Sequence, residues 1–249
     1  MAQTPMEREA GEGLQPGKAI GAHWRAGSDA ALVAVSGFDA GRPGRPAFHF
    51  RRATRHLPVT RLYVRDAFEA WFHDGLPGLG GDIVAATDGL MDMLAARGIS
   101  RVVFLGVSSG GYAALAMGWL AGVTCVKAIS PRTTLDAEKC RAWGDNRRPE
   151  AFARLHARAA AGPGSPPRSR DELFDLADVL AMPNAAGTRY DIYYDPENAI
   201  DHAHAENIAG LPHVRLEKVS GGGHLVGRRI MREPWFMARL ERALAIIPS

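Results

Sequence analysis

The chain has 249 residues, of which 46% are hydrophobic and 23% charged, and its formal net charge at pH 7 is +3. These values are those of an ordinary soluble globular protein with one large α/β domain or two small ones. No apolar run approaches the ~18 residues that span a bilayer, and two cysteines, Cys125 and Cys140, are too few for a disulfide framework.

The first 17 residues are polar and rich in glycine, and we expect them to be disordered ahead of a single domain over residues 18–249. They lack the apolar centre of a secretory signal, which favours a cytoplasmic protein with reduced, structural thiols. Seven later segments, rich in β-branched and aromatic residues, predict strands. These segments are 19–26, 31–38, 61–66, 101–107, 123–130, 189–195 and 214–220.

Helical periods lie between the predicted strands, at 82–98, 111–122 and 234–247. Strands that alternate with helices predict a mostly parallel sheet with right-handed crossovers and helices on both faces. Residues 135–182 interrupt the alternation, because they contain helical pieces and a Gly/Pro linker but no convincing strand. We expect this insertion to form a helical lid.

The insertion has two sets of side chains that bear on this role. Its arginines are Arg141, Arg147, Arg148, Arg154 and Arg158, and its large apolar residues include Trp143, Phe152, Leu155 and Leu173. The apolar set needs a partner surface, which we expect to be the mouth of a pocket. The arginines would then favour acidic or hydroxyl-rich leaving groups over plain lipids.

Arginine is concentrated in residues 41–56 and 141–170. One interpretation is that these are solvated loops and helix faces. The other is that an anionic or polyhydroxylated ligand approaches from that side. Neither stretch shows the basic helix face or the aromatic stacking platform of a nucleic-acid-binding protein, so no nucleic-acid partner is expected.

The segment "RVVFLGVSSGGYAALA" (101–116) contains G-x-S-x-G, formed by Gly106, Ser108 and Gly110. The motif lies where a predicted strand meets a predicted helix, which is the setting of a nucleophile elbow. Such a turn projects its serine above the sheet. The amide of Ser109 at the start of the helix would then point toward a developing oxyanion.

A serine nucleophile needs a histidine and an acid on later loops. His224 meets the first need, since "SGGGHLVG" follows the last predicted strand. Two residues compete for the second. Asp195 lies at the end of a strand, whereas Asp201 lies at the start of the next helix, where it can act as an N-cap or turn toward His224. The residues alone leave this choice open.

An oxyanion site needs a second amide, and the turn after the strand at 31–38 offers that of Phe38, in "SGF". Taken together, these motifs resemble those of the α/β-hydrolase superfamily. The run "SSGGYAAL", "ISPRTTLD", "DHAHAENI" and "GGGHLV" also resembles hydrolase-like proteins encoded with bacterial surface-polysaccharide genes.

The resemblance implies an α/β-hydrolase fold and a serine hydrolase or acyltransferase without a cofactor. Its substrate would be an acylated glycan or a small acyl ester. A hydrolase fold that binds a glycan or a protein without turnover is the alternative. No metal site is expected, because His202 and His204 would point to different faces of a helix. The sequence does not define the oligomeric state.

Overall fold

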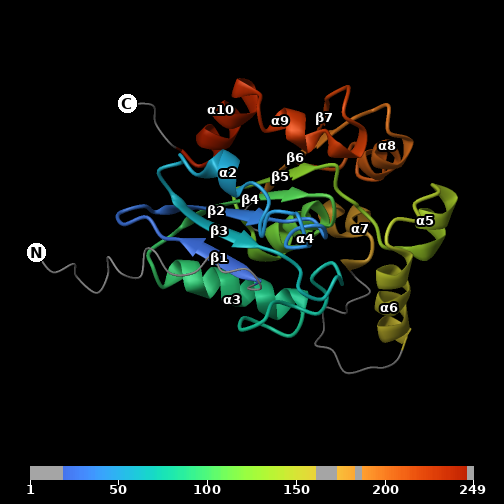
Figure 1. The fold of residues 1–249 in the computed structure, drawn as a ribbon, viewed down its shortest axis with the longest axis horizontal. Helices are drawn as coiled ribbons and strands as arrows, with labels where there is room; N and C mark the ends of the chain where they lie inside the picture. Colours follow the sequence, from blue (N-terminus) through green and yellow to red (C-terminus); the bar gives the residue numbers. More distant parts are fainter. Residues whose placement is uncertain (1–18, 161–172, 183–186, 246–249) are drawn as a thin grey trace, which may run out of the picture.

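The computed structural model describes residues 19–160, 173–182 and 187–245 (Figure 1). Its centre is a seven-stranded sheet in the order β1-β3-β2-β4-β5-β6-β7. The strands are β1 (Ile20–His23), β2 (Ala30–Val35), β3 (Thr60–Val64), β4 (Arg101–Val107), β5 (Cys125–Ile129), β6 (Arg189–Tyr194) and β7 (Val214–Lys218). β1 is antiparallel to β3, and the other neighbouring pairs are parallel. Every predicted strand is present, and the segment expected to be disordered lies outside the described residues.

Helices cover both faces of the sheet, as the alternating pattern predicts. They are α2 (Arg51–Thr54), α3 (Ile83–Ala95), α4 (Ser109–Ala121), α5 (Ala137–Ala142), α6 (Pro149–Ala160), α7 (Leu176–Ala181), α8 (Ala199–Glu206), α9 (Gly227–Ile230) and α10 (Pro234–Ala243). Figure 1 shows α3 and α4 on one side of the strands, and α9 and α10 on the other. Among the described residues, no helix is long and apolar enough to cross a membrane.

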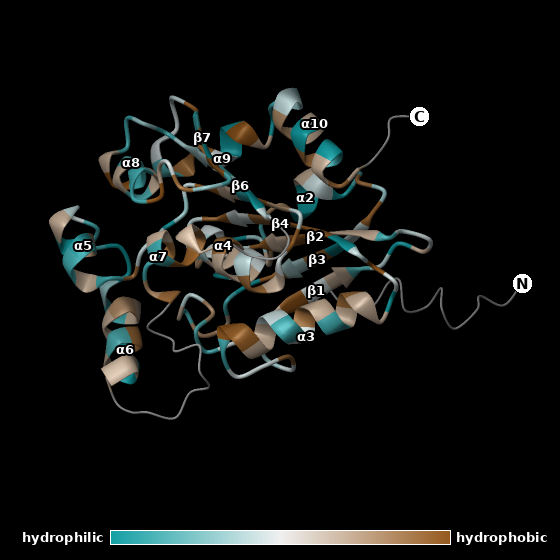
Figure 2. Ribbon diagram, turned by 180° about the vertical axis from the view of Figure 1, so that it is seen from behind, coloured by the Kyte–Doolittle hydropathy of each residue, from teal (hydrophilic) through white to brown (hydrophobic). Residues whose placement is uncertain are grey.

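The core lies in two layers because side chains along a strand alternate between faces. On β2, Val33 and Val35 join a cluster with residues of α3 and α4. Leu32 joins a second cluster that contains Phe236 and Leu240 of α10. A strand buried on both faces is apolar along its whole length. Figure 2 shows this as hydrophobic colour on the central strands and mixed colour on α3.

The predicted insertion lies between β5 and β6 and contributes α5, α6 and α7; residues 161–172 of it lie outside the described residues. Its apolar side chains do not gather at a pocket mouth as expected. Leu155 and Leu173 are buried in the larger core cluster, and Phe152 packs against that cluster. Contact with the core removes this apolar surface from water, which stabilises the arrangement. The role of the insertion as a lid stays a prediction.

Candidate active site

Ser108 occupies a sharp turn between β4 and α4. Its φ of 55° and ψ of −122° form a backbone conformation that residues other than glycine rarely adopt. The flanking glycines permit the turn. A Cβ on Gly106 would lie 2.1 Å from the carbonyl oxygen of Gly110, and a Cβ on Gly110 would lie 2.4 Å from that of Val35. The glycines of the motif are therefore required by close backbone approach, as in a nucleophile elbow.

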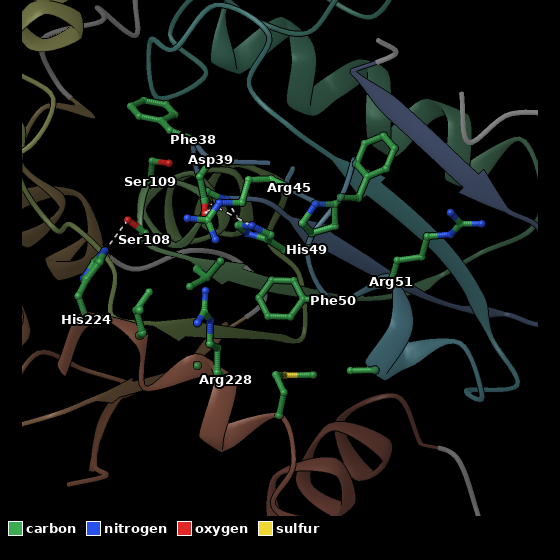
Figure 3. Close-up of a pocket in the computed structure, with 18 of the residues that line it drawn as sticks. Phe38, Asp39, Arg45, His49, Phe50, Arg51, Ser108, Ser109, His224 and Arg228 are labelled. Atoms are coloured by element: carbon green, nitrogen blue, oxygen red, sulfur yellow. Dashed lines mark hydrogen bonds and ion pairs between the residues drawn. The ribbon is translucent and has the colours of Figure 1, made fainter. Parts of the chain in front are cut away.

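His224 lies beside the serine, on the glycine-rich loop that follows β7. Its Nε2 is 2.9 Å from Oγ of Ser108 (Figure 3). Its side chain is 29% exposed, and the residue lines the pocket.

The two candidate aspartates occupy different places. Asp201 lies in α8, its side chain is fully buried, and both carboxylate oxygens are 2.9 Å from Nδ1 of His224. Asp195 accepts hydrogen bonds from the backbone amides of Glu197, at 3.0 Å, and of Gly223, at 2.7 Å. The structure therefore brings Asp201 to the imidazole and uses Asp195 to hold the backbone of the histidine loop.

The hydrogen bonds to Asp195 also act on its charge. Burial favours the neutral acid, but the amides of Glu197 and of the 221–223 loop outweigh it and lower the pKa of Asp195. Asp195 is thus an ionised anchor for that loop at neutral pH.

Arg147, from the insertion, contacts both members of the His224–Asp201 pair. Its Nη1 is 2.9 Å from Nδ1 of His224 and 3.0 Å from Oδ1 of Asp201. The same guanidinium donates through Nε and Nη2 to the two oxygens of Asp145, at 2.8 and 2.9 Å. A position of Arg147 over the pocket was expected from the sequence, but its contacts with Asp201 and His224 were not, since these two partners lie 54 and 77 positions away in the chain.

Asp145 is the centre of a buried ionic cluster behind the pair. It also accepts from Arg132, at 2.7 Å, and from Nε2 of His204, at 2.8 Å. The amide of Thr133 donates to Nδ1 of His204, which assigns the proton of that imidazole to Nε2. Burial opposes ionisation of Asp145, but Arg147, His204 and Arg132 together hold its pKa well below the usual range.

His204 is fully buried and His202 is partly exposed, so the two point to different faces of α8. Among the described residues, no three histidine, cysteine or acidic side chains are grouped so that they could hold a metal ion.

The turn after β2 lies against the serine. The amide of Gly37 donates to Nδ1 of His49, at 3.2 Å, and the amide of His49 donates to Oγ of Ser36, at 3.0 Å. No sequence signal marked His49 for this task. Within the described parts of the chain, the amides of Phe38 and Ser109 have no acceptor, and both residues line the pocket of Ser108. These are the two amides that we expected from the sequence to bind an oxyanion.

The pocket has a volume of about 1140 Å³. Aromatic and apolar side chains form part of its wall, including Phe38, Phe48, Phe50, Trp71 and Met231. Eight arginines also line it, against a single acidic residue, Asp39. Burial, with Arg45 and Arg228, outweighs Asp39 and lowers the pKa of His49 in this wall, so His49 is neutral at pH 7.

Comparison with solved structures gives the fold. The capsule O-acetyltransferase of Neisseria meningitidis serogroup A matches with a TM-score of 0.66 and 12% identity, over 90% of this chain and 91% of that one. Esterase B from Lactobacillus rhamnosis matches with a TM-score of 0.57 and 13% identity, over 91% and 82%. A thermophilic esterase from Thermogutta terrifontis matches with a TM-score of 0.50 and 16% identity, over 91% and 93%.

The chain has an α/β-hydrolase fold. This confirms the fold class that the motifs implied. At these identities the likeness concerns the fold alone. No protein-family model and no curated protein sequence matches the chain.

Proposed function

We propose that the protein is a serine-dependent ester hydrolase or acyltransferase whose nucleophile is Ser108. The observation that carries this proposal is a continuous hydrogen-bonded series at the pocket. Oγ of Ser108 is 2.9 Å from Nε2 of His224, and Nδ1 of His224 is 2.9 Å from Asp201. This is the geometry in which a neutral imidazole can remove the serine proton.

In the first half of the reaction, Oγ of Ser108 forms a bond to an ester-type carbonyl carbon while Nε2 of His224 takes the hydroxyl proton. The carbonyl electron pair moves to its oxygen, which the amides of Phe38 and Ser109 bind. Each such donor is worth on the order of 3 kcal/mol. The bond to the leaving oxygen then breaks, and His224 delivers the proton to it. Asp201 accepts Nδ1–H and stabilises the imidazolium.

The acyl group remains on Ser108 as an ester until a second nucleophile removes it. His224 takes a proton from that nucleophile, which attacks the acyl carbon, and Oγ of Ser108 leaves with the proton that His224 returns. Water gives hydrolysis, and a hydroxyl compound gives acyl transfer. An acylated glycan or a small acyl ester is the substrate class we propose.

Covalent labelling tests the nucleophile. A fluorophosphonate should label the protein at Ser108, and Ser108→Ala should abolish both labelling and p-nitrophenyl acetate hydrolysis, since no other serine among the described residues has an elbow around it. Circular dichroism of the variant is the control for folding. Activity above a few per cent of the original would contradict the assignment and direct attention to Ser109. A folded wild-type protein that takes no label would favour a binding protein without turnover.

Acyl transfer is the second candidate, and the size of the pocket favours it. A volume of about 1140 Å³ leaves room for an acceptor beside an acyl-enzyme. The match to a capsule O-acetyltransferase is in keeping with this function. The test is the partition of the acetyl group of p-nitrophenyl acetate when a sugar or polyol is supplied. Acetylated acceptor in excess over free acetate supports transfer, whereas acetate alone supports hydrolysis.

A further inference from the structure

The wall of the pocket carries far more positive charge than the reaction at Ser108 needs. Its arginines come from the segment 45–55, from Arg132 after β5, from the insertion and from α9. They are Arg45, Arg51, Arg52, Arg55, Arg132, Arg147, Arg148 and Arg228. Figure 3 shows Arg45, Arg51 and Arg228 around the same pocket as Ser108 and His224.

The arginines differ in how their charge is balanced. Arg132 and Arg147 are paired with Asp145, and Arg45 lies 3.9 Å from Asp39. Within the described residues the other five form no ion pair with a carboxylate. A cluster of unbalanced guanidinium groups around one cavity creates a positive potential that attracts an anion.

Two buried polar atoms in the same wall also lack a partner. Nη1 of Arg132 and Oγ of Ser109 form no hydrogen bond in the described structure, and their residues are 4% and 5% exposed. An unsatisfied buried donor costs about 1–3 kcal/mol. Both residues line the pocket, so a ligand with acceptor oxygens could satisfy both atoms.

We propose that the acyl-bearing substrate is polyanionic and carries phosphate groups, which this arginine wall binds while the acyl carbonyl lies at Ser108. Phosphate is favoured because its oxygens match the planar fork of the guanidinium, and because several arginines suit several charges. This inference rests on the proposed function, since it assigns the substrate class of the same site.

The experiment uses inorganic tripolyphosphate as the probe. At low salt it should slow the fluorophosphonate labelling of Ser108, and added NaCl should weaken the effect. In the double variant Arg51→Glu, Arg228→Glu, the tripolyphosphate concentration for half-protection should rise by about tenfold or more, because charge-assisted contacts are lost. Both side chains are exposed, so the variant should fold.

The matched control is Arg154→Glu, Arg242→Glu. These arginines are also exposed, lie outside the pocket wall and produce the same change of net charge. Their variant should stay within about twofold of the wild type, since distant surface charges are screened. The proposal would be overturned if tripolyphosphate protection weakened equally in both double variants. It would also be overturned if tripolyphosphate gave no protection of a wild-type Ser108 that labels normally.

If Ser108 takes no label at all, the proposed function fails, and the anion site is then tested by its effect on the melting temperature. Tripolyphosphate should then still raise the melting temperature of the wild type and of the control variant, but not that of Arg51→Glu, Arg228→Glu. The absence of any such shift would overturn the anion site as well.

Discussion

Asp195 and Asp201 are close in the chain but have different partners, and the way in which α8 is capped explains the difference. Asn198 is the N-cap, and its side chain accepts from the amide of Asp201. That leaves the carboxylate of Asp201 free to face His224. The sequence does not show which of the two residues caps α8, because Asn198 and Asp201 are equally good capping residues.

We expect Asp201→Asn to lower kcat/KM for p-nitrophenyl acetate by about 10⁴-fold, because an amide in this place favours the wrong imidazole tautomer. Asp195→Asn should act on stability instead. At least one of the backbone amides that donate to it loses an acceptor, which costs about 1–3 kcal/mol of unfolding free energy. Kinetics and urea unfolding of both variants check this. A larger rate loss in Asp195→Asn than in Asp201→Asn would reverse the assignment.

Ser108 and His224 could be located from the sequence because each stands in a short local pattern, an elbow and a glycine-rich loop after a strand. Arg147 and His49 could not. Arg147 reaches Asp201 across 54 positions of the chain, and His49 meets Gly37 through a loop with no periodic pattern. Contacts of this kind depend on the tertiary fold, which local residue patterns do not encode.

At the level of elements, the connection between α5 and α6 joins the insertion to the active site. Asp145 and Arg147 both lie on it, and they tie it to His204 and Asp201 of α8. The ion pairs are largely buried, so removal of one partner leaves charge uncompensated. Movement of the insertion would therefore disturb His224 and Asp201, the pair that we propose activates Ser108.

Asp145→Asn should reduce the free energy of unfolding at pH 7 by about 3–5 kcal/mol, since the buried Arg132 loses its counter-ion and Arg147 keeps only Asp201. The pKa of Asp145 is depressed in the folded protein. Its stabilising effect is therefore complete above the unfolded pKa of about 3.9, and it is lost as pH falls from there toward the folded pKa.

The stability difference between wild type and Asp145→Asn should consequently narrow in urea unfolding at pH 3 relative to pH 7. A difference that stays constant would mean that Asp145 contributes through packing alone. Cys140, whose carbonyl oxygen accepts from the amide of Asp145 at 2.8 Å, offers a conservative core control, because Cys140→Ala removes no charge.

Most strands were predictable because they are short, buried, apolar runs, and β7 because its apolar and polar residues alternate. The short helices were not predictable. α2 has four residues, too few for a helical period to be visible. Its arginines were open to two interpretations. Their place in the pocket wall follows only from how the segment 45–55 packs in the fold, where Phe48 contacts Ala34 of β2 and Tyr63 of β3. The apolar residues of the insertion were expected at the pocket mouth. Instead Phe152, Leu155 and Leu173 pack with the domain core, and Trp143 packs on His204 of α8.

For the whole molecule, the net charge does not show where the charged side chains lie. The formal total is +3, yet the pocket wall has eight arginines and one acid. Composition averages over the molecule, while a bound ligand is affected by local potential. This is why a nearly balanced chain can still present a strongly cationic site.

The backbone of Ser108 has a consequence for the stability of the whole protein. A non-glycine residue at φ 55°, ψ −122° costs of the order of 1–3 kcal/mol, and alanine keeps that cost, whereas glycine removes it. Glycine in turn loses roughly 0.5–1 kcal/mol through the entropy of the unfolded chain. Ser108→Gly should therefore exceed Ser108→Ala by about 1 kcal/mol in unfolding free energy, measured with urea. Equal stabilities would mean that the turn is unstrained. If the difference is found, a related protein that no longer needed the proposed reaction would gain unfolding free energy from the single substitution Ser108→Gly.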